Sequence, residues 1–366
     1  MFIVRGKFMR VALCFGGRSV EHDISVITAL QVLKTMLKMY EVIACYVDHD
    51  GNMFAKTIKE VCDKNSLLQS LKPVEMNKKN YEYYFQVINK IRQRIYFDFV
   101  LPLFHGTYGE DGSFQGLLRF LNIPYGFSDM LSLACMQDKE MMKHLLQEAN
   151  IPTIRWFVLH EKTILDQKIY EKCNRLGYPL ILKAAHLGSS IGIEVVDHQE
   201  QLQDKLQAIF KYDDKVIVER FIEHKVEYHM AIFKDDYSQI EAIQENEIYS
   251  FEKKYQNKEI KKSLPAKLNN QQIIKMQQYA KLCKEIFQID SMVRIDFIED
   301  QQGCLYVNEI NGIAGSFAYQ LWEASGKDLS QMIEMVIIEG LNRYRKYQSK
   351  IYKYQSDIEY DGHKIK

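Results

Sequence analysis

The chain has 366 residues, of which 47% are hydrophobic and 26% are charged, and a chain of this length is expected to form two or three domains. With only 18 glycines and 6 prolines, its composition is that of a globular protein and excludes long disordered or collagen-like segments. Lysine plus arginine equals aspartate plus glutamate at 48 each. The sequence therefore lacks the positive charge that drives binding to nucleic acid or to an anionic membrane, and we expect neither partner.

Seven cysteines occur singly, without a CxxC pair, which favours a reducing compartment over a disulfide framework. The start of the chain includes Arg5 and Lys7 and lacks the sustained apolar run of a signal peptide. No stretch approaches the roughly 18 consecutive apolar residues of a membrane-spanning helix. We therefore expect a cytoplasmic protein.

The first 125 residues have the pattern of an α/β domain built on a parallel sheet. An apolar run at residues 11–15 ends at Gly16 and Gly17, and apolar residues then recur about every three positions, as in a helix. Further strands are expected at residues 42–47 and 97–104, the second of them apolar enough to be buried on both faces.

Two stretches of this region lack a strand pattern. Residues 59–79 are polar and weakly patterned, which predicts a surface excursion. The tyrosine-rich run at residues 81–85 is interpreted as part of a helix. No basic groove accompanies these aromatic residues, so a base-stacking surface is not expected.

Beyond residue 126 helices and strands alternate, which predicts a second α/β unit, and after residue 226 the strands become longer. Helices are expected at residues 139–149, 163–176, 199–210, 271–287 and 329–347. Strands are expected at residues 156–159, 180–184, 193–196, 216–219, 226–233, 239–244, 292–299 and 305–310. A polar, lid-like stretch covers residues 249–262, and a charged tail follows the last helix.

The last two strands carry the most informative polar residues. If they form a hairpin with the simplest register, Arg294 lies opposite Glu309 and Asp296 lies opposite Val307. Because side chains alternate between the faces of a strand, Arg294, Asp296, Glu309 and Asn311 then share one face. Two carboxylates and a carboxamide, with no histidine or cysteine among them, form an oxygen-only ligand set that suits Mg²⁺ bridging phosphates. A solvated polar face with an ordinary ion pair explains the pattern about equally well.

Three further loops follow strands and could bind anions. Lys183 ends a strand and precedes a Gly/Ser-rich loop at residues 188–192, which could close over phosphate oxygens but does not match the GxxxxGK[ST] motif. Residues 16–22 open a helix whose N-terminus could bind an anion, although helix capping is the better explanation. Residues 105–112 follow a buried strand at the edge where α/β sheets bind ligands. Ordinary glycine-rich turns explain the first and third loops equally well.

In their order along the chain these stretches resemble the D-alanine–D-alanine ligase family of the ATP-grasp superfamily. The similar stretches are residues 16–25, 105–118, 123–128, 137–146, 180–193, 251–255, 293–297 and 307–311. The resemblance implies an α/β and α+β fold of three-domain ATP-grasp architecture, with a parallel-sheet N-terminal domain. The implied divisions are an N-terminal domain at 9–128, a central subdomain at 129–224, a C-terminal subdomain with the metal site at 225–347 and a tail at 348–366.

The resemblance also implies that the chain binds ATP and two Mg²⁺ ions, with Mn²⁺ as an alternative. The residues in nucleotide-binding positions are Lys139, Lys183, Glu219, Phe221, Ile222, Glu227 and Lys254. In that order they resemble two phosphate-contacting lysines, three residues of the adenine-binding strand, a ribose contact and a lid lysine. The implied metal ligands are Asp296, Glu309 and Asn311.

The implied activity is the joining of D-alanine to D-alanine through an acyl phosphate, for peptidoglycan precursor synthesis, by a homodimer. Glu21, Ser189 and Tyr255 resemble a hydrogen-bonded trio that orients the first amino acid. Arg294 and the backbone N–H of Gly315 resemble the groups that stabilise the oxyanion of the tetrahedral intermediate. The residues expected to contact substrate are His105, Gln320 and Leu321.

The sequence departs from the family pattern on the acceptor side. After Asn311 the family usually has a Pro-Gly-Met-Thr stretch, whereas this chain has Gly312 to Phe317 without proline or threonine, and Gln320 replaces a serine. A different acceptor, such as D-serine or a D-hydroxy acid, or a specialised dipeptide product, fits the same residues. A non-catalytic nucleotide-binding protein and an ATP-grasp carboxylase or carrier-dependent ligase remain alternatives, since fold alone does not fix function.

Overall fold

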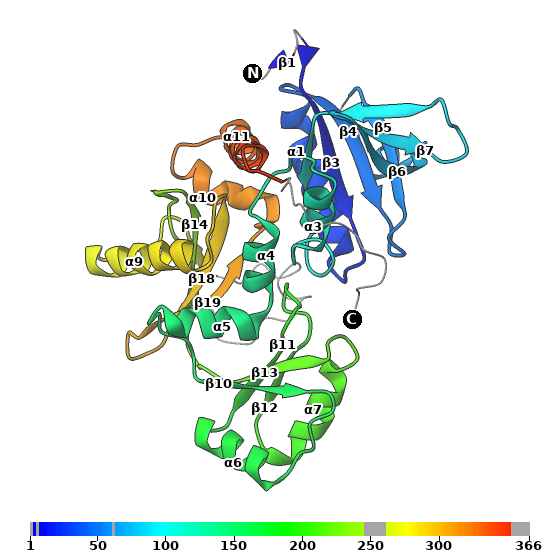
Figure 1. Ribbon diagram of the computed structural model, residues 1–366. Helices are drawn as coiled ribbons and strands as arrows, with labels where there is room; N and C mark the ends of the chain where they lie inside the picture. Colours follow the sequence, from blue (N-terminus) through cyan, green and yellow to red (C-terminus); the bar gives the residue numbers. More distant parts are fainter. Residues whose placement is uncertain (1–2, 5–6, 61–62, 245–260, 353–366) are drawn as a thin grey trace, which may run out of the picture.

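The computed structural model describes residues 3–4, 7–60, 63–244 and 261–352. Figure 1 shows three sheets that follow one another along the chain, with the N-terminal sheet at the top, the C-terminal sheet in the middle and the central sheet, in green, at the bottom. A two-stranded ribbon of β1 (Ile3–Val4) and β2 (Lys7–Phe8) precedes them. Among the described residues, no helix is both long and apolar enough to span a membrane.

The N-terminal sheet is mixed, with the strand order β8-β7-β6-β5-β4-β3-β9. Its strands are β3 (Arg10–Gly16), β4 (Glu41–Val47), β5 (Met53–Ile58), β6 (Lys72–Lys79), β7 (Glu82–Val87), β8 (Arg94–Phe97) and β9 (Phe99–Pro102). Strand β3 pairs in parallel with β4 and β9, and the other pairs are antiparallel. The expected parallel sheet is therefore confirmed for β4, β3 and β9, which lie at one end of the sheet, and an antiparallel extension of four strands was not predicted.

Three local predictions in this region are wrong. Residues 59–79 contain helix α2 (Lys64–Leu68) and strand β6 rather than an excursion. The tyrosine-rich run belongs to strand β7, because Tyr83 and Phe85 both pack their rings against Phe97 of the neighbouring strand. The single strand expected at 97–104 is divided at Asp98, whose carboxylate accepts hydrogen bonds from the backbone and guanidinium of Arg10.

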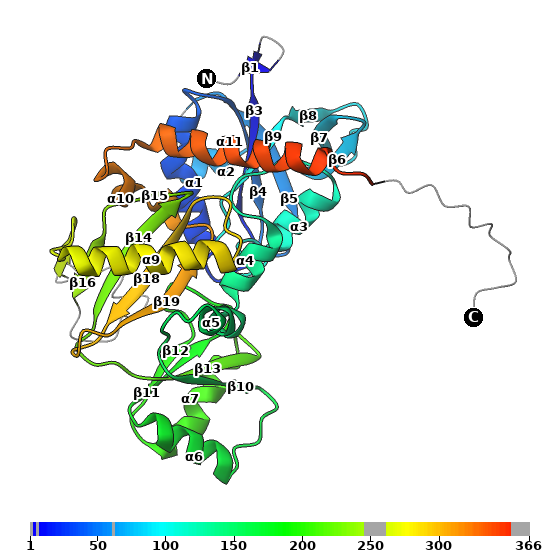
Figure 2. The same cartoon turned by 60° about the vertical axis from the view of Figure 1, so that its left-hand side comes forward.

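Helices cover both faces of this sheet. Strand β3 alternates, so that Leu13 belongs to the core shared with α1 (His22–Met36), whereas Cys14 packs in the core with α3 (Ser113–Phe120). The last helix, α11 (Leu329–Gln348), lies beside α1 in Figures 1 and 2 and contacts it. Buried Arg343 of α11 donates hydrogen bonds to the carbonyl groups of Tyr125 and Phe127, which tie the helix to the end of the first sheet.

The central sheet is antiparallel, with the order β10-β13-β11-β12. Its strands are β10 (Trp156–His160), β11 (Leu180–Ala184), β12 (Ile193–Val196) and β13 (Lys215–Arg220). Helices α4 (Met130–Gln137) and α5 (Lys139–Glu148) precede this sheet in the chain. Helix α6 (Gln167–Leu176) connects β10 to β11, and η1 (Gln199–Gln201) and α7 (Leu202–Ile209) connect β12 to β13. Helix α6 begins later than predicted because the Asp166 side chain caps the backbone N–H of Ile169.

The C-terminal sheet has the order β17-β16-β14-β18-β19, and β15 pairs with β14. The strands are β14 (Val226–Phe233), β15 (Asp236–Tyr237), β16 (Glu241–Gln244), β17 (Lys261–Ser263), β18 (Val293–Glu299) and β19 (Leu305–Asn311). Val293, Ile295 and Phe297 of β18 share a buried core with helix α9 (Asn270–Ile286). The alternate residues of β18 therefore point to the opposite face, away from this core. The chain then passes through η2 (Gly315–Ala318) and α10 (Tyr319–Glu323) to α11.

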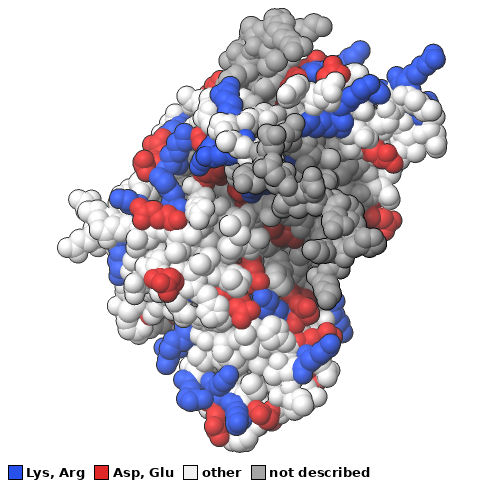
Figure 3. All heavy atoms as spheres, viewed as in Figure 1, with Lys and Arg blue, Asp and Glu red and all other residues white. Residues whose placement is uncertain are grey.

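Charges of both signs are interspersed over the face of the molecule seen in Figure 3, and neither sign forms a large continuous patch among the coloured residues. This distribution matches the equal numbers of acidic and basic residues in the sequence.

Candidate active site

A cavity of about 1390 Å³ lies where the central sheet, the C-terminal sheet and helix α1 meet. The predicted site residues that line it are Lys139, Lys183, Ser189, Glu219, Phe221, Ile222, Glu227, Arg294, Asp296, Glu309, Gly315, Gln320 and Leu321. Glu21 and Asn311 join this set through hydrogen bonds with Ser189 and Asp296, respectively. Lys254 and Tyr255 lie outside the described residues.

The expected polar face of β18 and β19 forms part of the cavity wall. The guanidinium of Arg294 donates two hydrogen bonds of 2.7 Å to the two carboxylate oxygens of Asp296. The amide nitrogen of Asn311 donates to Asp296 Oδ2 at 3.0 Å. Glu309 is the direct cross-strand partner of Asp296. The four residues therefore lie together on one face, as alternation predicted.

The predicted register of this hairpin is wrong by two residues from Arg294 to Asp296 and by one residue from Phe297 to Glu299. Arg294 pairs with Asn311 and Asp296 with Glu309, whereas Phe297 pairs with Val307. Asn308 is thus an extra residue on β19 and forms a β-bulge. Strict alternation would place Asn308 and Glu309 on opposite faces of the sheet, but a bulge redirects the side chain of its extra residue. Asn308 and Glu309 consequently both line the cavity.

Two lysines of the central part of the chain reach this face. Lys183 Nζ lies 3.0 Å from Asn308 Oδ1, and Lys139 Nζ lies 3.4 Å from Glu309 Oε1. Lys139 also donates to the carbonyl of Leu187 at 2.5 Å, which holds its ammonium group beside the loop after β11. Cationic groups and oxygen ligands therefore meet at one end of the cavity, an arrangement suited to the phosphate groups of a nucleotide and a divalent cation.

A buried charge cluster supports these lysines. The carboxylate of Glu219 is fully buried and lies 2.5 Å from Lys143 Nζ and 2.7 Å from Lys183 Nζ. Burial alone would raise the pKa of Glu219, but the charges of Lys143 and Lys183 outweigh it and lower the pKa to about 2. Lys143 was missed in the sequence, although it follows Lys139 by four positions and so shares its face of helix α5.

Three further residues predicted to bind the nucleotide also line the cavity. Phe221 and Ile222 follow β13 and line the cavity together with Glu227 of β14. Lys225 forms an ion pair with Glu227. Burial would raise the pKa of Glu227, but the charge of Lys225 and its hydrogen bond lower the pKa. Two apolar side chains beside an ionised carboxylate are suited to an adenine ring and a ribose hydroxyl pair.

The N-terminal domain contributes Glu21, whose carboxylate accepts a hydrogen bond from Ser189 of the loop after β11. This contact joins the first helix to the Gly/Ser-rich loop, as predicted. Ser189 and Ser190 have positive φ angles of 52° and 62°, which non-glycine residues adopt mainly where surrounding contacts hold them. The hydrogen bond from Ser189 to Glu21 is one such contact.

His105 is buried and does not line the cavity, and its expected contact with substrate stays a prediction. Its Nε2 lies 3.1 Å from Thr28 Oγ1. Burial and the charge of Arg294 lower the pKa of His105 to about 4, so the ring is neutral at pH 7. The adjacent carboxyl group of Glu110 accepts hydrogen bonds from the backbone N–H groups of Ile313 and Gly106, at 3.1 and 3.2 Å. We interpret His105 and Glu110 as positioning residues for the loop after Asn311.

The acceptor-side segment has an unusual backbone. Ser316, Phe317 and Ala318 have φ angles of 50°, 61° and 49°, and three successive non-glycine residues in the left-handed region together cost several kcal/mol, at about 1 to 3 each. Phe317 is fully buried and packs against Phe127 at 5.2 Å between ring centroids, which offsets part of this strain. The segment places Gln320 on α10, where it lines the cavity.

His229 of β14 is a further cavity residue that sequence reasoning missed. The hairpin pattern predicted that no histidine accompanies the carboxylates, but β14 lies beside β18 and pairs His229 directly with Asp296. The sequence could have indicated His229, because it follows Glu227 by two positions on a predicted strand and so shares the face of that predicted ribose contact.

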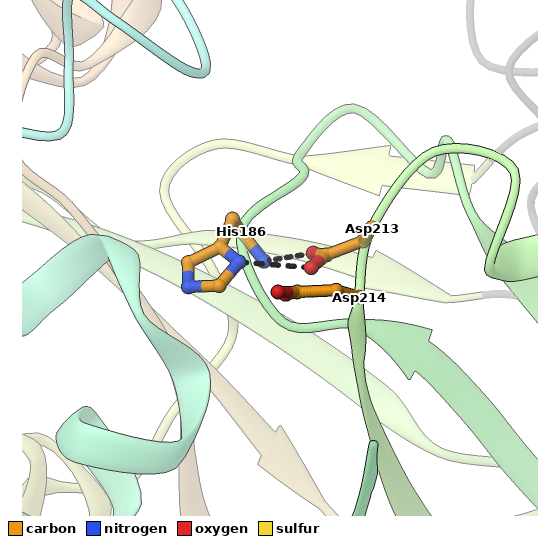
Figure 4. Close-up of side chains that lie close together, drawn as sticks. All are labelled: His186, Asp213 and Asp214. Carbon is orange, nitrogen blue, oxygen red and sulfur yellow. Dashed lines mark hydrogen bonds and ion pairs between the residues drawn. The ribbon is translucent and has the colours of Figure 1, made fainter. Parts of the chain in front are cut away.

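His186, Asp213 and Asp214 bring potential metal-ligand atoms within 4.8 Å of one another, outside the cavity (Figure 4). Asp213 accepts a hydrogen bond from His186 Nδ1 at 2.9 Å, and Asp138 lies 3.3 Å from Nε2. Hydrogen bonds with Asp138 and Asp213 raise the pKa of His186 to about 9. The ring is therefore an imidazolium that donates from both nitrogens, and we interpret the group as an ion-pair network that fixes the loop after β11 to the start of α5.

Substitution of His186 by glutamine is expected to reduce stability in a pH-dependent way. The pKa of His186 is raised from 6.5 to about 9 on folding, so its contribution is fully present below about pH 6.5 and is lost as the pH rises through 9. The His186 side chain is 35% exposed, which limits the expected loss to about 1 to 2 kcal/mol at pH 6. Urea unfolding at about pH 6 and pH 10 checks this, and an equal loss at both values would contradict it.

Sequence comparisons identify similar proteins. A family profile described as D-ala D-ala ligase N-terminus matches residues 10–128, and one described as D-ala D-ala ligase C-terminus matches residues 145–338. The D-alanine--D-alanine ligase of Thermosipho melanesiensis is 33% identical over 353 residues, which cover 92% of this chain and 95% of the relative. That of Enterococcus hirae is 30% identical over 354 residues, with 93% and 98% covered. Among solved structures, the D-alanine-D-alanine ligase from Coxiella burnetii is similar with a TM-score of 0.82 and 25% identity, covering 93% of this chain and 96% of the other.

Proposed function

We propose that this chain, which belongs to the D-alanine–D-alanine ligase family, joins D-alanine to D-alanine in an ATP-dependent reaction. The observation that carries the proposal is the meeting of Asp296, Glu309 and Asn311 with Lys139 and Lys183 in one cavity. Relatives that span nearly the whole chain and have this activity support it.

ATP would lie with its phosphate groups between the two lysines and the face of β18 and β19. Asp296, Glu309 and Asn311 are suited to hold the two Mg²⁺ ions, or Mn²⁺, because all three offer oxygen atoms. When bound there, the cations would neutralise charge on the transferred phosphoryl group. Lys139 and Lys183 add positive charge on the opposite side, and Glu219 keeps Lys183 in place.

The chain's own groups then act on the two amino acids. Attack of the first carboxylate on the γ-phosphate expels ADP and gives an acyl phosphate, and the amine of the second amino acid then displaces inorganic phosphate and loses a proton to form the peptide bond. Glu21 and Ser189 orient the first amino acid, and the guanidinium of Arg294 with the Gly315 N–H stabilises the oxyanion of the tetrahedral intermediate. The roles assigned to Lys254 and Tyr255 stay predictions.

Incubation of the protein with ATP, Mg²⁺ and a panel of D- and L-amino acids and hydroxy acids tests this function. The expected result is ADP and phosphate release coupled to a D-alanyl-D-alanine product identified by mass. A product with D-serine or a D-hydroxy acid would assign a different acceptor. Failure of every pair to stimulate ADP release would overturn the ligase proposal in favour of a nucleotide-binding role.

Substitution of Gln320 by alanine is expected to change acceptor preference with little effect on ATP affinity. Gln320 lines the cavity from α10, on the acceptor side, whereas the nucleotide positions that line it lie on α5, β11, β13 and β14 and directly after β13. A roughly 10-fold rise in the KM for the acceptor matches the loss of one hydrogen bond to a charged group, about 1.5 kcal/mol. Steady-state kinetics with each substrate varied in turn measure this, and an unchanged acceptor profile would remove Gln320 from the pocket.

The remaining family expectations are proposals of the same kind. We infer a homodimer that acts in the cytoplasm, with divisions near residues 128 and 224 between the three parts of the chain. Light scattering of the purified protein would measure the mass of the assembly.

A further inference from the structure

Four side chains form a row across the C-terminal sheet, at right angles to its strands. His229 of β14 is the direct cross-strand partner of Glu241 on β16 and of Asp296 on β18, and Asp296 in turn is the partner of Glu309 on β19. All four residues line the cavity. An imidazole therefore stands inside a row of carboxylates, next to one of the proposed metal ligands.

The two ring nitrogens of His229 have different surroundings. Nδ1 lies 3.2 Å from Glu241 Oε2, within hydrogen-bond distance. Nε2 lies 3.9 Å from Asp296 Oδ2, which is too long for a hydrogen bond. Because an ionised carboxylate can only accept, the contact with Glu241 selects the tautomer with its proton on Nδ1, and Nε2 is the ring nitrogen that faces Asp296.

The 3.9 Å between His229 Nε2 and Asp296 Oδ2 lies between the two separations expected for ligand atoms of one octahedral cation. With metal–ligand bonds of about 2.1 Å, two ligand atoms on an octahedral ion are about 3.0 Å apart when adjacent and about 4.2 Å apart when opposite. A carboxylate on the second nitrogen is also the usual support of a metal-binding histidine, since it fixes the tautomer and the ring orientation. The side chains of His229, Glu241 and Asp296 are only 14%, 11% and 10% exposed, so little motion is available to them.

We propose that His229, held by Glu241, is a nitrogen ligand of the divalent cation at Asp296, and that it raises the affinity of this site for imidazole-binding cations such as Co²⁺ relative to Mg²⁺. The location of the cation rests on the proposed function. The preference follows from ligand chemistry, because imidazole suits the later transition metals whereas Mg²⁺ prefers oxygen.

Metal titrations of the full chain with Co²⁺ and with Mg²⁺ test the proposal, with ADP present in both. His229→Gln is expected to weaken Co²⁺ binding about 10-fold or more and Mg²⁺ binding by less than about 3-fold, because the glutamine amide still offers an oxygen. His198→Gln makes the same chemical change at an exposed position outside the cavity and is expected to alter neither value. An unchanged ratio of the two affinities in His229→Gln would overturn the proposal.

A spectroscopic measurement gives a direct second readout. Pulsed electron paramagnetic resonance of Mn²⁺ bound to the protein, labelled with ¹⁵N-histidine, is expected to show a nitrogen coupling that disappears in His229→Gln. Bound Mn²⁺ without such a coupling would exclude His229 as a ligand. If His229→Gln does not fold, Glu241→Gln replaces it, with an expected loss of about 10-fold in Co²⁺ affinity through the lost support of the ring.

These outcomes separate the inference from the proposed function. Ligation that proceeds with Mg²⁺ while Mn²⁺ shows no nitrogen coupling would overturn the inference alone. A nitrogen coupling in a protein that joins no amino acids would overturn the ligase assignment and leave His229 as a ligand.

Discussion

Glu309→Gln is expected to lower kcat by at least about 10³-fold, because it removes both a carboxylate ligand for the cation and the ionic partner of Lys139. The side chain of Glu309 is 30% exposed and its ion pair with Lys139 spans 3.4 Å. An ion pair of this kind contributes only about 1 kcal/mol or less. The variant should therefore stay folded and lose activity, which thermal unfolding and ADP release measure separately.

Glu299→Gln is a matched control for this experiment. Glu299 lies on the same hairpin, outside the cavity, and accepts hydrogen bonds from Gln272 that a glutamine oxygen can still accept. The control removes one negative charge from the same sheet and is expected to keep its activity. Retained turnover in Glu309→Gln would contradict the metal assignment.

Glu219→Gln is expected to reduce the free energy of unfolding by about 3 to 5 kcal/mol, since it leaves buried ammonium groups without their counter-charge. Lys143 is 1% exposed and lies 2.5 Å from the Glu219 carboxylate. Lys183 loses the same partner, so the KM for ATP should also rise. Urea unfolding at neutral pH measures the first effect and steady-state kinetics the second.

Two further measurements test the cause of this loss. The pKa of Glu219 falls from 4.5 to about 2 on folding, so its contribution, about 3 kcal/mol, is present above pH 4.5 and is lost as the pH falls to 2. Glu219→Gln should lack this part of the acid dependence. Lys143→Met combined with Glu219→Gln should recover part of the stability, because it removes the more buried of the two ammonium groups that Glu219 balanced. A double variant as unstable as Glu219→Gln would refute the explanation.

The buried strands could be predicted from sequence because they consist of continuous apolar residues. Strands β3, β4, β11 and β13 are each buried over most of their length, and the prediction placed each within one or two residues of its bounds. Strand β6 was missed because only Val74 of its eight residues is buried. Strand β6 lies between β5 and β7 in the antiparallel extension with most of its side chains exposed or half-buried, so its sequence resembles that of a loop.

The parts of the candidate site that depend on side-chain alternation along one strand could be predicted from sequence. The parts that depend on the pairing register between two strands could not. Alternation placed Arg294 and Asp296 on one face correctly. The bulge at Asn308 follows from packing between strands, and no residue type in the turn indicates it. The left-handed residues 316–318 were equally hidden, because serine, phenylalanine and alanine have no preference for positive φ.

Helix α11 is the last described helix of the chain, yet it completes the N-terminal part of the fold, which is synthesised first. Gly340 of this helix lies so close to Tyr125 that a Cβ atom there would approach the Tyr125 carbonyl oxygen to 2.2 Å. Arg343 binds the backbone of the same segment. The N-terminal sheet of a nascent chain therefore lacks this cover until residues 329–348 have been synthesised, and exposed apolar surface of this kind favours aggregation during folding.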